Sequence, residues 1–265
     1  MKNLINWKLF FILLTACVIA SMLVIPYSLA LTEIEAEITP LKILLSAAQN
    51  LVIFAIAVFF GLFFSKRLYL NVSGITMPGL RLPILEGALE GKSQSKELKA
   101  ILLPSIGFGA LAGVIIVLLS IPFNQLIPEF QTSNVSTPSA WKAFLASFYG
   151  GIAEEVLLRL FMVSLLVWLS SKIKRTKEGC PTDIGIWISI VLASIVFGIG
   201  HLPATAQIVT LNGIVVTRAI LLNGAGGVIF GWLYWKKGLE SAIIAHFSTD
   251  IVLHIITPFV VSFFS

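Results

Sequence analysis

Two adjacent carboxylates and an arginine stand in the middle of a long apolar stretch of the chain. Glu154, Glu155 and Arg159 are flanked by largely apolar sequence, from 143 to 153 and from 160 to 169. Ionisable side chains at such a depth in a membrane are costly, so they pair, line a wet cavity or carry function. This group is therefore the first candidate for acid–base chemistry.

The spacing assigns different roles to the two glutamates. Glu155 and Arg159 are four residues apart, so they share a helix face and can form an ion pair. We expect this pair to be structural; the alternative is that Arg159 binds a substrate carboxylate. Glu154 is rotated by about 100° from Glu155, so we expect it to be free of the pair and available for chemistry.

All three histidines of the chain also fall in apolar segments or at their ends. His246 lies four residues before Asp250, so the two side chains share a helix face. His201 closes an apolar segment, and His254 continues the stripe as a helix-end polar residue. Dispersing these groups in lipid would be costly, so we expect Glu154, His201, His246 and Asp250 to surround one intramembrane cavity.

A glutamate and two histidines around one point support two kinds of hydrolysis. In the first, a carboxylate acts as general base on water while imidazoles assist proton transfer and stabilise an oxyanion. In the second, Glu154, His201 and His246 bind zinc. The chain has no His-Glu-x-x-His sequence, which disfavours zinc, and no Gly-x-Ser-x-Gly elbow, which disfavours serine catalysis through Ser248.

The composition is that of a membrane protein made of several helices. The chain has 265 residues, of which 57% are hydrophobic and 12% charged, and its mean hydropathy is +0.98. No series of short alternating segments suggests a barrel. The net charge of +5 comes from basic residues in loops, which we interpret as orientation signals and not as a nucleic-acid surface.

Seven apolar segments predict an all-α polytopic membrane helix bundle of about seven to eight helices. The predicted segments are 9–31, 41–64, 100–121, 140–169, 184–201, 219–235 and 239–256. We expect a short interfacial helix in the cytosolic loop 69–99 and a re-entrant or interfacial helix at 204–218. Residues 122–139 are predicted as an outer loop, with Pro122, Pro128 and Pro138 breaking the helix.

The basic residues also predict the orientation. They cluster at the amino terminus and after the even-numbered segments, so the positive-inside rule places the amino terminus in the cytosol. Seven segments would leave the carboxy terminus outside. We expect one membrane domain, in which residues 1–140 carry no catalytic motif and 141–256 form the catalytic core.

Three short motifs occur in order, each on a predicted membrane segment: Glu154-Glu155-x-x-x-Arg159, Phe197-x-x-x-His201 and His246-x-x-x-Asp250. Together they resemble the motifs of the CAAX-protease and bacteriocin-processing (CPBP) family, also called the Abi family. The glycine-rich sequence from Asn223 to Ser241 is similar to the lead-in to the last of these motifs. The resemblance covers roughly 141–256, a little under half of the chain.

The resemblance implies a type II CAAX prenyl endopeptidase-like intramembrane protease that needs no cofactor. It implies that Glu154 activates water with help from His201, and that His246 and Asp250 form the oxyanion hole. Eukaryotic members usually have Asn at the last position, whereas many prokaryotic relatives have Asp, as here. An ionised Asp250 would repel an oxyanion, so it must be protonated or orient His246. The substitution also argues against a farnesylated substrate.

The remaining motif residues are expected to support the site. Glu155 and Arg159 would position Glu154, and Phe197 would pack in the core at the border of the site. The partners implied are a peptide or membrane-protein substrate and the lipid bilayer, in the plasma membrane of a prokaryote. Two alternatives are a scaffold or bacteriocin self-immunity protein of the same family without peptide cleavage, and a small-molecule transporter, which the missing internal repeat disfavours.

Overall fold

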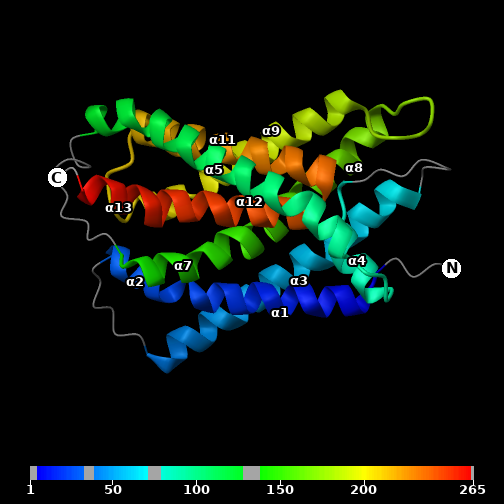
Figure 1. The fold of residues 1–265 in the computed structure, drawn as a ribbon, viewed down its shortest axis with the longest axis horizontal. Helices are drawn as coiled ribbons and strands as arrows, with labels where there is room; N and C mark the ends of the chain where they lie inside the picture. The colour runs from blue at the N-terminus through cyan, green and yellow to red at the C-terminus, as the bar shows by residue number, and fades with distance from the viewer. Residues whose placement is uncertain (1–4, 33–38, 71–78, 128–137, 264–265) are drawn as a thin grey trace.

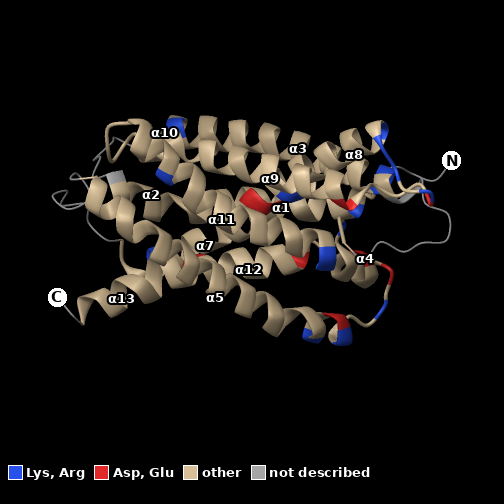
Figure 2. Ribbon diagram, turned by 90° about the horizontal axis from the view of Figure 1, so that it is seen from above, with Lys and Arg blue, Asp and Glu red and all other residues tan. Residues whose placement is uncertain are grey.

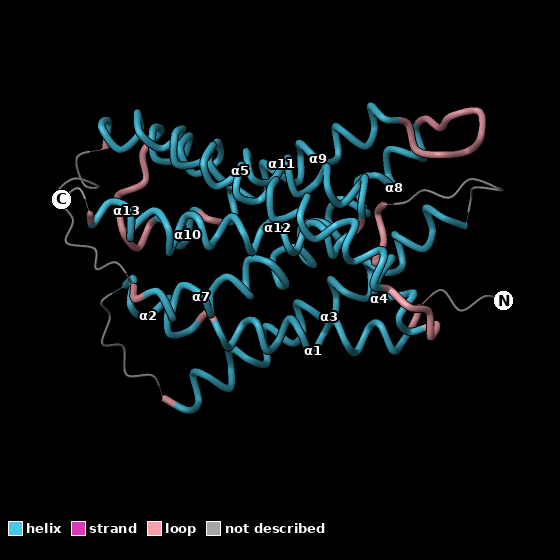
Figure 3. Tube along the Cα trace, viewed as in Figure 1, coloured by secondary structure: helices cyan, strands magenta, loops and turns pink. Residues whose placement is uncertain are grey.

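The fold is an elongated bundle of helices that run along its long axis (Figure 1). The computed structural model describes residues 5–32, 39–70, 79–127 and 138–263. Within these ranges the regular elements are all helices and no strand occurs (Figure 3). The predicted all-α class is therefore confirmed.

Six helical segments of the described chain are long and apolar enough to cross a membrane. Several are built from more than one element in direct succession. In chain order they are α1 (Trp7–Leu23) with α2 (Ile25–Thr32); α3 (Pro40–Leu70); α5 (Ser95–Leu126); α9 (Asp183–Gly200) with α10 (Leu202–Thr205); α11 (Gly213–Lys237); and α12 (Leu239–Ile251) with η3 (Val252–Ile256) and α13 (Thr257–Ser262).

The segment with the two glutamates also traverses the bundle, as a succession of α- and π-helical turns. It comprises α7 (Ala140–Phe148), η1 (Tyr149–Glu154), η2 (Val156–Val163) and α8 (Ser164–Ile173), and we call it the motif helix. Large apolar side chains such as Phe11, Leu103 and Ile188 are exposed on the outside of the bundle, as a lipid-facing surface requires. The chain is thus a multi-pass membrane protein.

The helix α5 is longer than predicted. It continues through Pro122 to Leu126, so the expectation that Pro122 breaks the helix is wrong. Proline is tolerated in membrane helices because neighbouring groups satisfy the backbone that it frees. The end of α5 is held by Ile127, which is buried against Val209 and Val215. Pro128 lies outside the described residues.

The separate helix expected at 204–218 is also absent. The short α10 ends at Thr205, and α11 already begins at Gly213. The reason is Asn212, whose side chain accepts hydrogen bonds from the backbone N–H groups of Ile214 and Val215 at 2.9 and 3.0 Å. This N-cap satisfies donors that a helix start leaves open, and it makes Arg218 part of α11.

The predicted short helix of the loop after α3 is α4 (Pro83–Leu89). The first turn of α4 donates two backbone hydrogen bonds to Glu240 Oε1, from Ile84 at 3.1 Å and Leu85 at 2.9 Å. Just before it, the Leu80 N–H donates to the carbonyl of Tyr234 at 2.9 Å. The loop is thereby fixed over the junction of α11 and α12.

The basic side chains gather at one end of the bundle, where the chain enters α1 (Figure 2). We call it the basic end; it holds Lys8, Lys66, Arg67, Arg81, Lys92, Lys96, Lys99, Lys172, Lys174, Arg175, Lys177, Lys236 and Lys237. Lys42 and Lys142, at the starts of α3 and α7, lie toward the opposite end.

Glycines bring α5 and α12 into direct backbone contact. Gly109 and Gly113 are four residues apart, the spacing of small residues that allows close packing of membrane helices. A Cβ on Gly109 would overlap the carbonyl oxygen of Ala245 and lie 2.8 Å from Ser248 Cβ. The closeness lets Thr249 Oγ1 donate a hydrogen bond to the Gly109 carbonyl at 2.8 Å.

We expect Gly109→Ala to lower the melting temperature of the purified protein, because the added methyl group forces α12 away from α5. Overpacking of this kind typically costs about 1–3 kcal/mol. The matched control is Gly107→Ala on the same helix, where a Cβ would have no neighbour within 4 Å. Equal melting temperatures for the two variants would contradict the close contact.

Candidate active site

The motif helix widens where it carries the glutamates. Tyr149–Glu154 and Val156–Val163 are π-helical, a rare geometry that is frequent at functional sites. Two glycines in this stretch face α12. A Cβ on Gly150 would overlap the carboxylate of Asp250, and one on Gly151 would lie 3.1 Å from the carbonyl oxygen of Ile243. The missing side chains therefore let the third motif lie against the first.

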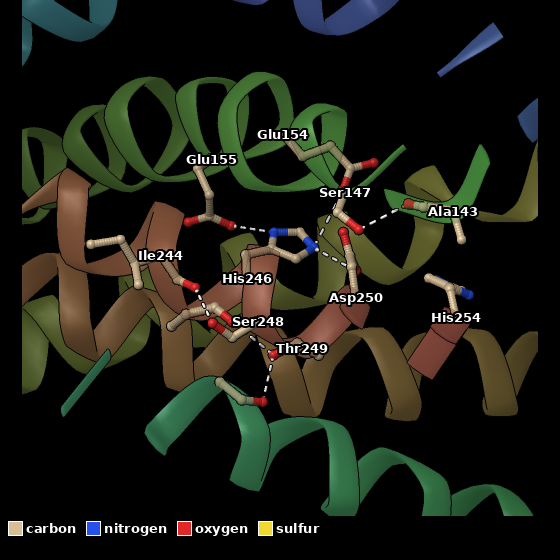
Figure 4. A network of polar contacts seen from close by, with 12 residues as sticks. Ala143, Ser147, Glu154, Glu155, Ile244, His246, Ser248, Thr249, Asp250 and His254 are labelled. Atoms are coloured by element: carbon tan, nitrogen blue, oxygen red, sulfur yellow. Dashed lines mark hydrogen bonds and ion pairs between the residues drawn. The ribbon is translucent and has the colours of Figure 1, made fainter. Parts of the chain in front are cut away.

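A buried network of charges connects the two helices. The predicted pair is present, with Arg159 Nη1 3.0 Å from Glu155 Oε1. The same carboxylate oxygen is 2.8 Å from His246 Nδ1 (Figure 4). Arg159 Nη2 also donates to the carbonyl of Gly227 at 3.1 Å. The exposed fractions of Glu155, Arg159 and His246 are 0%, 1% and 5%, so these charges are compensated by one another and not by water.

The contact between Glu155 and His246 fixes the imidazole. A carboxylate held by Arg159 is ionised and can only accept hydrogen bonds, so His246 Nδ1 must be the donor. The other ring nitrogen, Nε2, then faces away from Glu155. Sequence spacing could not reveal this contact, because the two residues are 91 positions apart.

Two phenylalanines complete the surroundings of the imidazole. Phe230 stacks on the His246 ring at 4.5 Å between centroids, and Phe197 meets it edge-on at 5.7 Å. The Arg159 guanidinium lies over both phenylalanine rings, 5.0 Å from Phe197 and 5.4 Å from Phe230. Such cation–π contacts are strongest when desolvated. Phe197 therefore borders the site, as the resemblance implies, and Phe230 is a neighbour that the motifs did not indicate.

Two carboxylates converge on the free nitrogen of His246. Glu154 Oε2 and Asp250 Oδ1 are each 3.7 Å from Nε2, as Figure 4 shows. These distances are longer than a direct hydrogen bond. The side chains of Glu154 and Asp250 are 20% and 14% exposed, whereas Glu155 is fully buried. Glu154 is thus the glutamate that is turned toward open space.

That space is a cavity of about 750 Å³ within the bundle. Glu154, His201, His246 and Asp250 all line it. The other walls come from α2, α5, α11 and α13. Four predicted residues from three separate segments thus border one cavity.

His201 is the least directly connected of the four. Its Nδ1 is 2.9 Å from the carbonyl oxygen of Phe197, and its ring meets Phe197 edge-on at 4.7 Å. Among the described residues no hydrogen bond or ion pair joins His201 to Glu154. The structure places His201 on the same cavity wall without a contact to the carboxylates.

Three further polar residues on the cavity wall were not assigned to the site from the sequence. The hydroxyl of Tyr27 is 3.1 Å from His254 Nδ1, and both line the cavity together with Arg218. The four-residue spacing of His246, Asp250 and His254 could have indicated His254. Tyr27 carries no such sequence pattern, because α2 lies far from the motifs in the chain.

The zinc alternative requires Glu154, His201 and His246 as a ligand cluster. In the part of the chain that the structure describes, no three His, Cys, Asp or Glu side chains are grouped as metal ligands would be. The carboxylates near His246 Nε2 and the hydrogen bond of His201 to Phe197 do not form an open tetrahedral set. The described side chains therefore do not fit a catalytic zinc ion.

Comparison with protein-family models gives a match over residues 136–252 to the family described as type II CAAX prenyl endopeptidase Rce1-like. The matched range contains all three motifs and therefore confirms the resemblance. Comparison with curated proteins and with solved structures gives no match.

We expect Arg159→Ala to lower the yield and the melting temperature of the protein, because it leaves Glu155 buried without its counter-charge. Removing one member of a buried pair typically costs about 3–5 kcal/mol. The control is Lys92→Ala, which breaks an ion pair with Glu90 that is 2.6 Å long but largely exposed. Such surface pairs contribute at most about 1 kcal/mol. If Arg159→Ala melts like the control, the pair is not structural and a substrate role for Arg159 gains support.

Proposed function

Because residues 136–252 match the model of the Rce1-like family of type II CAAX prenyl endopeptidases, we propose that the chain is an intramembrane endopeptidase and that the cavity is its active site. The substrate would be a peptide or a membrane-associated protein. The reaction would be hydrolysis of a peptide bond by water that a glutamate activates.

One observation carries this proposal. Glu154 and Asp250 approach His246 Nε2 at the cavity wall, while Glu155 holds the opposite nitrogen of the ring at 2.8 Å. A general base must be within reach of the proton that it accepts, directly or through one water. The partly exposed Glu154 meets this condition for a water in the cavity, and Glu155 does not, since it is fully buried.

In the proposed reaction, Glu154 accepts a proton from a water molecule while the water oxygen attacks the carbonyl carbon of the scissile bond. His201, which lines the same cavity, assists by holding this water. The proton on Glu154 is then transferred to the nitrogen of the departing amine as the carbon–nitrogen bond breaks. The products are a carboxylic acid and an amine, and the glutamate is restored.

The developing oxyanion requires a donor on the other side of the carbonyl group. We assign this role to His246, which would donate from Nε2 into the cavity while Nδ1 donates to Glu155. Asp250 is one helical turn further on the same face, 3.7 Å from Nε2. We assign Asp250 the positioning of His246, because an ionised carboxylate in contact with the oxyanion would repel it.

The two carboxylates near Nε2 allow a matched test of which one is the base. We expect Glu154→Gln to reduce peptide cleavage by about 10²–10⁴-fold, since the amide keeps the shape but cannot accept the proton. Asp250→Asn neutralises the other carboxylate at the same distance from Nε2, and we expect it to keep most of the activity. The measurement is cleavage of a peptide library by the purified protein, with products identified by mass spectrometry.

The opposite result, with Asp250→Asn inactive and Glu154→Gln active, would assign the base to Asp250. Absence of cleavage by wild-type protein across the library would favour the scaffold or self-immunity function. Binding of peptides by Glu154→Gln, measured in the same preparation, separates loss of chemistry from loss of substrate binding.

Metal content tests the metal-free mechanism against the zinc alternative. We expect active protein to contain far less than one zinc ion per chain and to keep its activity in a chelator. If zinc is used, His246→Ala should lose metal and activity together, because His246 would be one of the three ligands. Elemental analysis of the wild-type protein and of His246→Ala distinguishes the two cases.

A further inference from the structure

The bundle has two ends of different charge. Figure 2 shows lysines and arginines gathered at the basic end. Thirteen of the 18 lysines and arginines of the chain belong to this end, and Arg159 is buried. By the positive-inside rule, loops rich in Lys and Arg remain in the cytosol. The basic end is therefore the cytosolic end of the bundle.

The cavity occupies the other half of the bundle. Its lining residues on α5 run from Ile116 to Asn124, near the end of that helix, and those on α11 from Arg218 to Phe230, which excludes its basic last turn. The cavity also reaches Leu31 near the end of α2 and Val261 near the end of α13. None of the residues of the basic end lines it.

Buried side chains lie between the imidazole and the basic end. On this side of the imidazole lies the buried pair of Glu155 and Arg159. The Ser164 hydroxyl, further along the motif helix, is 2.8 Å from the hydroxyl of Tyr234. Tyr234, Leu239 and Leu80 are fully buried, and the loop before α4 bonds to the backbone of Tyr234. A peptide could not reach His246 from the basic end without displacing this layer.

We infer that the catalytic cavity is entered from the non-cytosolic face of the membrane. The substrate is then a peptide segment on that face, either an exported peptide or the outer part of a membrane protein, and not the tail of a cytosolic protein. That the bound peptide is a substrate rests on the proposed function. The access route itself does not, because the direction of entry can be measured without any cleavage.

Cysteine labelling with a membrane-impermeant maleimide tests the access route on the full-length protein in cells. Cys180 lies in the loop between α8 and α9 at the basic end and is partly exposed, whereas Cys17 is buried. Cys180 is thus a natural reporter of the basic end. Ser28→Cys, a change of one atom on the exposed face of α2 that lines the cavity, places a reporter in the cavity. Ser120→Cys on α5 gives a second reporter in the same cavity.

We expect Ser28→Cys and Ser120→Cys, each combined with Cys180→Ala, to be labelled in intact cells nearly as strongly as in permeabilised cells. Wild-type protein should be labelled at Cys180 only after permeabilisation, and Cys180→Ala alone gives the background from Cys17. Labelling of the cavity reporters from the cytosolic side only, or not at all, would overturn the inference. So would labelling of Cys180 in intact cells, because the basic end would then face outward. Peptidase assays on the same variants show separately whether the proposed function holds.

Discussion

The arrangement of the site depends on the contact of one buried carboxylate with a guanidinium and an imidazole. Glu155 Oε1 meets both Arg159 and His246 in the buried interior of the bundle. Because an unpaired buried charge is far more costly than a paired one, the network holds the motif helix, α12 and the Gly227 backbone of α11 in one position. It also decides which nitrogen of His246 faces the cavity.

Small residues allow these helices to come close enough for the network to form. Gly150 and Gly151 admit α12 to the motif helix. On α11, a Cβ at Gly227 would lie 2.8 Å from Ser194 Oγ, and one at Gly231 2.7 Å from Ile190 Cγ2. The close packing of α11 on α9 expected from this Gly-x-x-x-Gly spacing is therefore present. It holds Phe197 against the guanidinium of Arg159.

The bundle is asymmetric along its axis, and the chemistry follows this asymmetry. Toward the basic end, aromatic and aliphatic side chains such as Tyr234, Leu239 and Leu80 are buried. Toward the other end the helices surround a cavity that is lined by the carboxylates of Glu154 and Asp250, by imidazoles and by Arg218. Glu154 and Asp250 are thus accessible from the cavity, whereas the ion pair of Glu155 and Arg159 is buried.

The sequence alone determined the class of the protein and most of its helices. Long apolar segments must form helices in a membrane because lipid offers no partners for backbone groups, and costly charges within them marked Glu154, His201, His246 and Asp250 as candidates. The predicted bounds of two helices were wrong. Pro122 did not end α5, because the tertiary contacts of Ile127 hold its last turn, and the cap at Asn212 started α11 earlier than hydropathy indicated.

Only the tertiary structure decided how the candidates meet. The spacing of four residues predicted the pair of Glu155 and Arg159, because both lie on one helix. No spacing could predict that the same carboxylate holds His246, that Phe230 stacks on that ring, or that Tyr27 bonds to His254. These contacts join residues that are far apart in the chain, and the packing of whole helices determines which of their faces touch.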